Sequence, residues 1–147
     1  RQAFHSAVVD DDEGIRLTLA EAVDRFEGCQ CVGCFASGED ALAGINDTRP
    51  HVVLMDINMP GMNGIECVSR LKAGNPDIEV VMLTVYQDAD NVLKSLAAGA
   101  NGYLLKRASR EELLAAIHQV VAGAVLRRSL DRSHAIDVVF EEPPGHC

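Results

Sequence analysis

Long hydrophobic runs are missing from this 147-residue chain, and no segment approaches the length of a membrane span. Residues 1–10 also lack the hydrophobic core of a signal peptide. We therefore expect no membrane contact and a cytoplasmic protein. An initiator methionine is absent as well, since the chain begins at Arg1, which suggests that its ends are those of a processed or recombinant product.

Basic side chains are scarce: 13 lysines and arginines stand against 22 aspartates and glutamates, for a net charge of −9. This sign opposes binding through phosphate contacts. We therefore expect that this domain itself contacts no nucleic acid. Hydrophobic residues make up 48% and charged residues 24% of the chain, as in a soluble globular domain, and the length fits one domain.

Three of the five cysteines, Cys29, Cys31 and Cys34, crowd into one predicted strand. Strict alternation along a strand would put Cys29 and Cys31 on one face and Cys34 on the other. No second Cys/His pair lies nearby to complete a metal site. We interpret these cysteines as small buried residues rather than as a disulfide or a metal site.

Five apolar strand candidates alternate with five helical patterns, which predicts a doubly wound parallel sheet of the α/β class. The strands are expected at residues 7–10, 29–35, 52–56, 79–84 and 102–105. Helices are expected around residues 15–26 and at 37–45, 64–73, 88–98 and 110–122, two of which open with capping-box spacing at Ser37 and Ser109. Gly123 is expected to end the last helix and the domain, so residues 124–147 form a tail or linker with one short apolar run at 136–140.

A single carboxylate, Asp56, follows the apolar run 52–55 and enters a loop rich in proline and glycine. Ligands of open α/β sheets bind outside the carboxyl ends of the strands, so Asp56 is well placed for chemistry. The alternative is a turn aspartate that bonds its own loop, and this segment alone does not decide between the two.

Four consecutive acids, Asp10 to Glu13, follow the first strand. In a sheet of order 2-1-3-4-5 they would converge on Asp56, and a cluster of carboxylates with open positions suits Mg²⁺. The alternative for Asp11 or Asp12 is a cap on the first helix. Thr84 ends the fourth strand, and Lys106 follows the fifth. Together the four strand ends indicate a phosphoryl site.

These motifs resemble the receiver domains of two-component response regulators, which have the CheY-like fold. The resemblance covers residues 6 to about 123 and rests on Val9-Asp10-Asp11, on residues 54–64, on Met82-Leu83-Thr84 and on residues 99–106. The Leu83-Thr84-Val85-Tyr86 and Ala-Asn-Gly-Tyr-Leu-Leu-Lys runs are most similar to the NarL/FixJ type, whose members are usually transcription factors.

The resemblance implies that Asp56 accepts a phosphoryl group from a sensor histidine kinase or a small phosphodonor, and that the domain catalyses only its own phosphorylation and dephosphorylation. It assigns Mg²⁺, for which Mn²⁺ can substitute, to Asp10, Asp11, Asp56 and the backbone carbonyl of Asn58. Lys106 and Thr84 would hold phosphoryl oxygens, and Tyr103 would turn inward as the face formed by the fourth helix, fifth strand and fifth helix repacks. Homodimerisation on phosphorylation is a further implied partner interaction.

Two positions depart from the common receiver pattern. Arg107 replaces the proline that often follows the lysine, which leaves open whether that peptide bond is cis. Val85 is bulkier than the usual alanine or glycine and would narrow access to Asp56.

Other readings of the pattern fit less well. A flavodoxin-like carrier would find its phosphate repelled by Asp10 to Glu13, and an aspartyl phosphatase needs a second acid where Asn58 stands. A receiver-shaped module that takes no phosphate is opposed by the complete acid, threonine and lysine set. The residues after Gly123 are too few for a helix-turn-helix domain, so we expect either an output domain missing from this chain or a stand-alone receiver acting through protein partners.

Overall fold

The computed structural model of the protein describes residues 4–85 and 89–130. Five parallel strands form one sheet in the order β2-β1-β3-β4-β5. Their bounds are β1 Phe4–Val9, β2 Cys29–Phe35, β3 Val52–Asp56, β4 Glu79–Thr84 and β5 Gly102–Leu105. The helices that connect them are α1 Glu13–Asp24, α2 Gly38–Thr48, α3 Gly64–Gly74 and α4 Ala89–Ala98, and α5 Arg110–Leu130 follows the last strand. The predicted fold class and strand order are confirmed.

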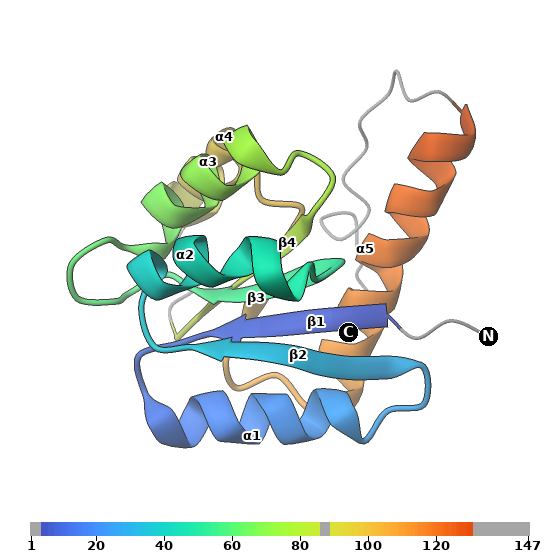
Figure 1. Ribbon diagram of the computed structural model, residues 1–147, viewed down its shortest axis with the longest axis horizontal. Helices are drawn as coiled ribbons and strands as arrows, with labels where there is room; N and C mark the ends of the chain where they lie inside the picture. Colours follow the sequence, from blue (N-terminus) through green and yellow to red (C-terminus); the bar gives the residue numbers. More distant parts are fainter. Residues whose placement is uncertain (1–3, 86–88, 131–147) are drawn as a thin grey trace.

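Helices cover both faces of the sheet, so the core has two layers (Figure 1). One layer packs α2 and α3 against β1, β3 and β4 through residues such as Ile45, Met55 and Val68. The other packs α1 and α5 against the opposite face through Val23, Leu54 and Ile117. Since every residue of β3 and β4 is buried, these strands need apolar side chains on both faces, as the unbroken apolar run in β3 predicts.

Side-chain caps fix where α1, α2 and α5 begin. Asp12 is the residue that caps α1, accepting a hydrogen bond from the backbone N–H of Ile15 at 3.0 Å. Ser37 accepts from Asp40 at the start of α2. Ser109 and Glu112 form a reciprocal capping box before α5, with distances of 2.7 and 3.1 Å. The predicted caps are confirmed, and Asp11 is left available for the site.

The last helix does not end at Gly123, as predicted, but continues to Leu130. A glycine inside a helix costs only about 1 kcal/mol relative to alanine, and the residues on both sides of it favour helix. The predicted end was therefore wrong. The apolar run at 136–140 lies outside the described residues. Among the residues that are described, no helix is both long and apolar enough to cross a bilayer.

Strict alternation also fails in β2. The register pairs Ser6 with Cys31 but Ala7 with Gly33, so Val32 is an extra residue in a β-bulge. Cys34 consequently pairs with Val8 and projects to the same face as Cys31. The prediction that Cys34 lies opposite Cys31 was wrong because a bulge resets the period-2 pattern.

Candidate functional site

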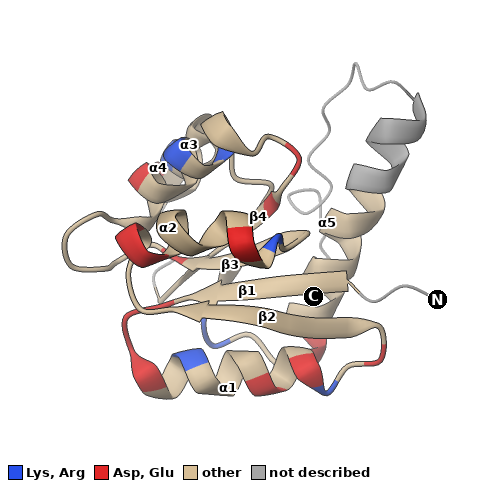
Figure 2. Ribbon diagram, viewed as in Figure 1, with Lys and Arg blue, Asp and Glu red and all other residues tan. Residues whose placement is uncertain are grey.

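Three carboxylates gather at the carboxyl end of the sheet. Asp10 follows β1 directly and is 0% exposed, and Asp56 ends β3 and is 3% exposed. Asp11 is exposed to solvent. One carboxylate oxygen from each residue lies within 4.8 Å of the others. Figure 2 shows the acidic β1–α1 loop leading into α1 at this end of the sheet. The predicted convergence of the first acidic loop on Asp56 is confirmed.

Lys106 supplies the positive charge of the site. Its Nζ lies 2.9 Å from Asp10 Oδ2 and 3.1 Å from Asp56 Oδ1, and the side chain is largely buried. Its position is fixed through the backbone, because its N–H donates to the carbonyl of Thr84 at 2.7 Å. The end of β4 therefore holds the loop after β5 so that one lysine bridges two carboxylates.

The electrostatics of the site follow from burial and crowding. Burial and the charge of Asp10 raise the pKa of Asp56 to about 6, although Lys106 acts against this shift. Burial lowers the pKa of Lys106, but the hydrogen bonds and charges of Asp10 and Asp56 outweigh it, so that the pKa is raised overall. Lys106 is thus a permanent cation, and Asp56 is mostly ionised at neutral pH.

Hydrogen bonds to backbone groups and to Arg16 hold Asp10 in place. Its N–H donates to the carbonyl of Phe35 at 3.1 Å, and its Oδ1 accepts from the N–H of Asp12 at 2.9 Å. The Arg16 guanidinium donates to the Asp10 carbonyl at 2.8 Å. Sequence reasoning missed Arg16, whose only signal was its place in the first turns of the helix after the acids.

The backbone packs tightly behind Asp56. A Cβ at Gly64 would overlap the carbonyl oxygen of Asp56, so only glycine fits where α3 begins. The N–H of Gly64 donates to the carbonyl of Ile57 at 2.8 Å, and the N–H of Ile57 donates to Leu83 at 3.1 Å. These bonds fix the chain on both sides of Asp56. The predicted motif contained Gly64, but its close approach became visible only in the structure.

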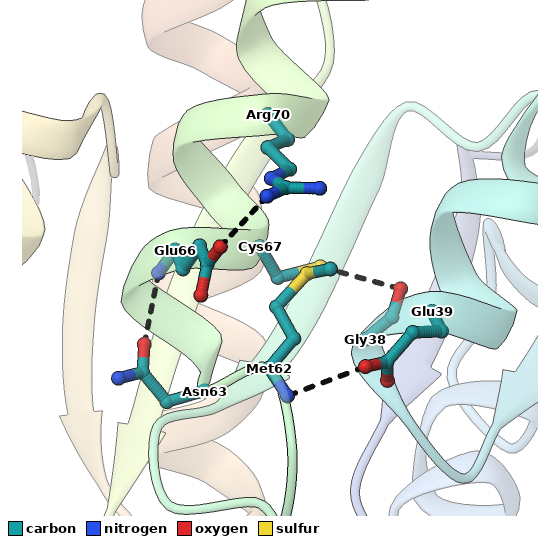
Figure 3. Close-up of polar contacts among 7 residues, drawn as sticks. All are labelled: Gly38, Glu39, Met62, Asn63, Glu66, Cys67 and Arg70. Carbon is teal, nitrogen blue, oxygen red and sulfur yellow. Dashed lines mark hydrogen bonds and ion pairs between the residues drawn. The ribbon is translucent and has the colours of Figure 1, made fainter.

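The loop between β3 and α3 is tied to α2 (Figure 3). Glu39 Oε2 accepts from the N–H of Met62 at 3.4 Å, and Cys67 Sγ donates to the carbonyl of Gly38 at 3.7 Å. Asn63 caps α3 by accepting from the N–H of Glu66 at 2.9 Å. Sequence reasoning did not identify Glu39, which lies 23 residues from its partner and has no motif of its own.

The other predicted residues lie near the same edge. Thr84 is fully buried at the end of β4, and Tyr103 in β5 packs against the layer formed by α2 and α3. Asn58 is exposed two residues after Asp56. Val85 is 53% exposed, so its side chain is largely directed into solvent. The described residues contain no cis peptide bond, so the bond between Lys106 and Arg107 is trans.

A cavity of about 220 Å³ adjoins the site. It lies where α1 meets the ends of β4 and β5 and the start of α5. Its lining is mostly apolar, including Ile15, Leu83 and Leu113, and Lys106 supplies the charged side chain of its lining.

The donor set fits a hard divalent cation. Three carboxylates and one lysine leave excess negative charge in a largely buried pocket. Each carboxylate offers oxygen atoms as ligands. Mg²⁺ prefers carboxylate and carbonyl oxygens together with water, and the exposed Asp11 leaves a side open to solvent. The arrangement suits a phosphoryl group that meets a cation on one side and Lys106 on the other.

Comparison with known proteins identifies the family of this chain. Residues 7–118 match the family described as response regulator receiver domain. The chain is 41% identical over 116 residues to response regulator GacA of Pseudomonas aeruginosa, a match that covers 79% of this chain and 54% of GacA. It is 35% identical to response regulator UvrY of Escherichia coli, covering 79% and 53% of the two chains. The chain thus spans about half the length of the curated relatives it matches.

Solved structures agree. The signal receiver domain of the putative response regulator NarL from Mycobacterium tuberculosis superposes with a TM-score of 0.80 at 27% identity, over 84% of this chain and 99% of that one. A two-component response regulator of the LuxR family from Aurantimonas gives a TM-score of 0.79 at 29% identity, over 83% and 87%. The resemblance to NarL/FixJ-type receivers is confirmed. This chain belongs to the receiver domain family of two-component response regulators.

Proposed function

We propose that this receiver accepts a phosphoryl group on Asp56 from the phosphohistidine of a sensor histidine kinase in the cytoplasm. The observation that carries the proposal is the position of Lys106 Nζ, 3.1 Å from Asp56 and 2.9 Å from Asp10, within a cluster of three carboxylates. A structural ion pair would need one carboxylate. Three carboxylates around one lysine favour a site that binds further positive charge together with a phosphoryl group.

The transfer is nucleophilic catalysis by a carboxylate. An Asp56 oxygen attacks phosphorus as the P–N bond to the donor histidine breaks; the other ring nitrogen of that histidine carries a proton, so the products are a phosphoaspartate and a neutral imidazole. With a pKa of about 6, Asp56 is ionised at neutral pH and able to attack. Lys106 then neutralises charge on a phosphoryl oxygen. Water hydrolyses the acyl phosphate and ends the signal.

Asp10, Asp11, Asp56 and the backbone carbonyl of Asn58 are the groups that would hold Mg²⁺ or Mn²⁺. When bound, the ion offsets the charge of the carboxylates and of the phosphoryl oxygens. Asp10 is preset for this role, because one of its oxygens accepts from the backbone of Asp12 and the other lies beside Lys106. Catalysis here extends only to the domain's own phosphorylation and dephosphorylation.

Thr84 and Tyr103 are the proposed switch. Thr84 would move to bond the phosphoryl group, and Tyr103, half-buried in β5, would turn into the space released. The α4-β5-α5 surface would then change partners, or join a second copy of the chain. Because the matched segment makes up only about half of the relatives, we infer that this surface controls a DNA-binding output domain; a stand-alone receiver acting by protein interaction is the alternative.

Intact mass spectrometry after incubation with acetyl phosphate and Mg²⁺ tests the proposal. The wild-type chain should gain one phosphoryl group, and the gain should require Mg²⁺, because the carboxylate cluster carries more negative charge than Lys106 offsets. Asp56→Asn should gain none. Asp40→Asn, an exposed acid in the first turn of α2, is the matched control and should behave as wild type.

An adduct that persists in Asp56→Asn would place the phosphoryl group elsewhere and contradict the assignment. If neither acetyl phosphate nor a phosphorylated kinase produced an adduct, the phosphate-independent module would be the better explanation.

A further inference from the structure

The bulge in β2 creates a second chemical feature in the edge strand, where Cys34 precedes Phe35, whose carbonyl accepts from the Asp10 N–H. Cys31 and Cys34 are separated by two residues, and their Sγ atoms lie 3.9 Å apart. Cys34 is exposed and Cys31 is half-buried, and both are free thiols. The pair lies on the outermost strand of the sheet, where solvent reaches it.

The bulge brings Cys31 and Cys34 close together. Because Val32 is extra, Cys31 and Cys34 are separated by only two steps of the partner strand, from Ser6 to Val8. Two steps at about 3.3 Å each give a backbone separation of about 6.6 Å, which falls at the upper end of the range of about 4.4–6.8 Å found for disulfides. In a regular strand the same residues would be about 10 Å apart on opposite faces.

We infer that Cys31 and Cys34 form a redox modification site, a dithiol that a peroxide-class oxidant converts to an intramolecular disulfide. The two sulfurs need to approach by about 2 Å, since a disulfide bond measures about 2.05 Å. Sheet edges at a bulge adjust with little disruption, because the bulged residue leaves the ladder locally unpaired.

The two thiols have different roles. Cys34 is exposed and meets the oxidant first: its thiolate attacks one peroxide oxygen, the O–O bond breaks, and a sulfenic acid and hydroxide form. Cys31 then attacks that sulfur, the S–O bond breaks, and the thiol proton leaves with the hydroxyl as water. Two electrons pass from the two sulfurs to the peroxide, and an external thiol reductant reverses the change.

Cys31 takes the second step because its sulfur is less accessible to the oxidant than that of Cys34 and lies 3.9 Å from it, so its proton leaves only as it attacks the oxidised sulfur. Burial and the neighbouring Cys34 raise the pKa of Cys31 to about 12, so it stays protonated at neutral pH. Its thiol donates to the carbonyl of Gly33 at 3.5 Å, and its backbone N–H is held by Asp24 at 2.7 Å. These contacts hold its sulfur in place beside Cys34.

Counting free thiols in denaturant tests the inference. In the full chain carrying Cys147→Ser, four cysteines remain for alkylation with N-ethylmaleimide. Brief treatment with hydrogen peroxide should remove two labels and two hydrogen atoms of mass, and peptide mapping should join Cys31 to Cys34. A thiol reductant should restore both labels. Cys31→Ser should block the disulfide and leave a Cys34 sulfenic acid that dimedone traps.

Cys29→Ala is the matched control, because Cys29 lies in the same strand and is buried. It should still lose two labels on oxidation. The inference is overturned if the wild-type thiols remain fully reactive after peroxide, if the disulfide maps to other cysteines, or if labels lost before oxidation return with a chelator, which would mean that the pair binds a soft metal ion instead.

Discussion

A central strand and the edge strand of this sheet differ in burial and in how regularly their residues pair. β3 is buried throughout and regular, and its register against β1 and β4 has no interruption. β2 has a neighbour on one side only, is mostly half-buried or exposed, and contains a bulge. Because β3 is enclosed, the course of its backbone is fixed to its last residue, and the Asp56 side chain lies in the site. Because β2 is open, one extra residue redirects Cys34 at little cost.

The same comparison explains where repulsion is tolerated. The end of β3 holds Asp56 against Asp10 in a nearly dry pocket, which is unfavourable for folding, and Lys106 offsets only part of it. The edge strand places the sulfur atoms of its two thiols 3.9 Å apart. Chemistry based on charge therefore lies where backbone and core fix the groups firmly, and the thiol pair lies where the backbone can adjust.

Gly64→Ala should have the largest effect on stability. The added Cβ would overlap the Asp56 carbonyl, so the loop after β3 must shift, and we expect a loss of about 3 kcal/mol or more in the free energy of unfolding. Gly74→Ala, at the other end of α3, meets no atom within 4 Å and should be neutral or stabilising by up to about 1 kcal/mol. Urea unfolding of both variants measures the difference, and equal effects would contradict the close packing behind Asp56.

Leu54→Ala compares the two strands directly. Leu54 is fully buried in β3, so its truncation should cost about 3 kcal/mol through lost burial and a cavity. Val32→Ala at the bulge of β2 should cost less than about 1 kcal/mol, because Val32 is only half-buried. Denaturant midpoints at constant slope check the prediction. Comparable losses would show that the edge strand is as tightly packed as the centre.

Asp56→Asn should stabilise the protein in the absence of Mg²⁺. The raised pKa means that folded Asp56 takes up a proton as the pH falls through about 6, whereas the unfolded chain does so only near 3.8. Wild-type stability from this group therefore increases as the pH falls from about 6 to about 4. At pH 7 the variant should gain roughly 1–3 kcal/mol, and its advantage should disappear toward pH 4.

The matched variant is Asp24→Asn at the end of α1, beside the edge strand, which keeps an oxygen to accept from the Cys31 N–H and should change stability by about 0.5 kcal/mol or less. Thermal unfolding of both variants at pH 7 and pH 4.5 makes the comparison. An Asp56→Asn variant that is less stable than wild type at pH 7 would mean that Lys106 outweighs the repulsion at the end of β3.

The pattern of residues determined the parallel sheet and, with the strand order that the resemblance to receivers implies, the meeting of Asp10, Asp11, Asp56 and Lys106. It could do so because buried parallel strands require apolar runs and because the carboxyl ends of such strands share one edge. The helix caps at Ser37 and Ser109 were equally local, since a cap involves residues only three apart. The assignment of Mg²⁺ and of the roles of Thr84, Tyr103 and Asn58 stays a prediction.

Only the tertiary structure decided the long-range and irregular features. Contacts such as Arg16 with the Asp10 carbonyl and Glu39 with Met62 join separate elements without a motif. The continuation of α5 beyond Gly123 reflects a helix whose favourable residues outweigh one glycine. The bulge that pairs Cys31 with Cys34 depends on how β2 meets β1. Periodicity assumes that every residue advances the ladder by one step, and only the pairing of two strands shows where it does not.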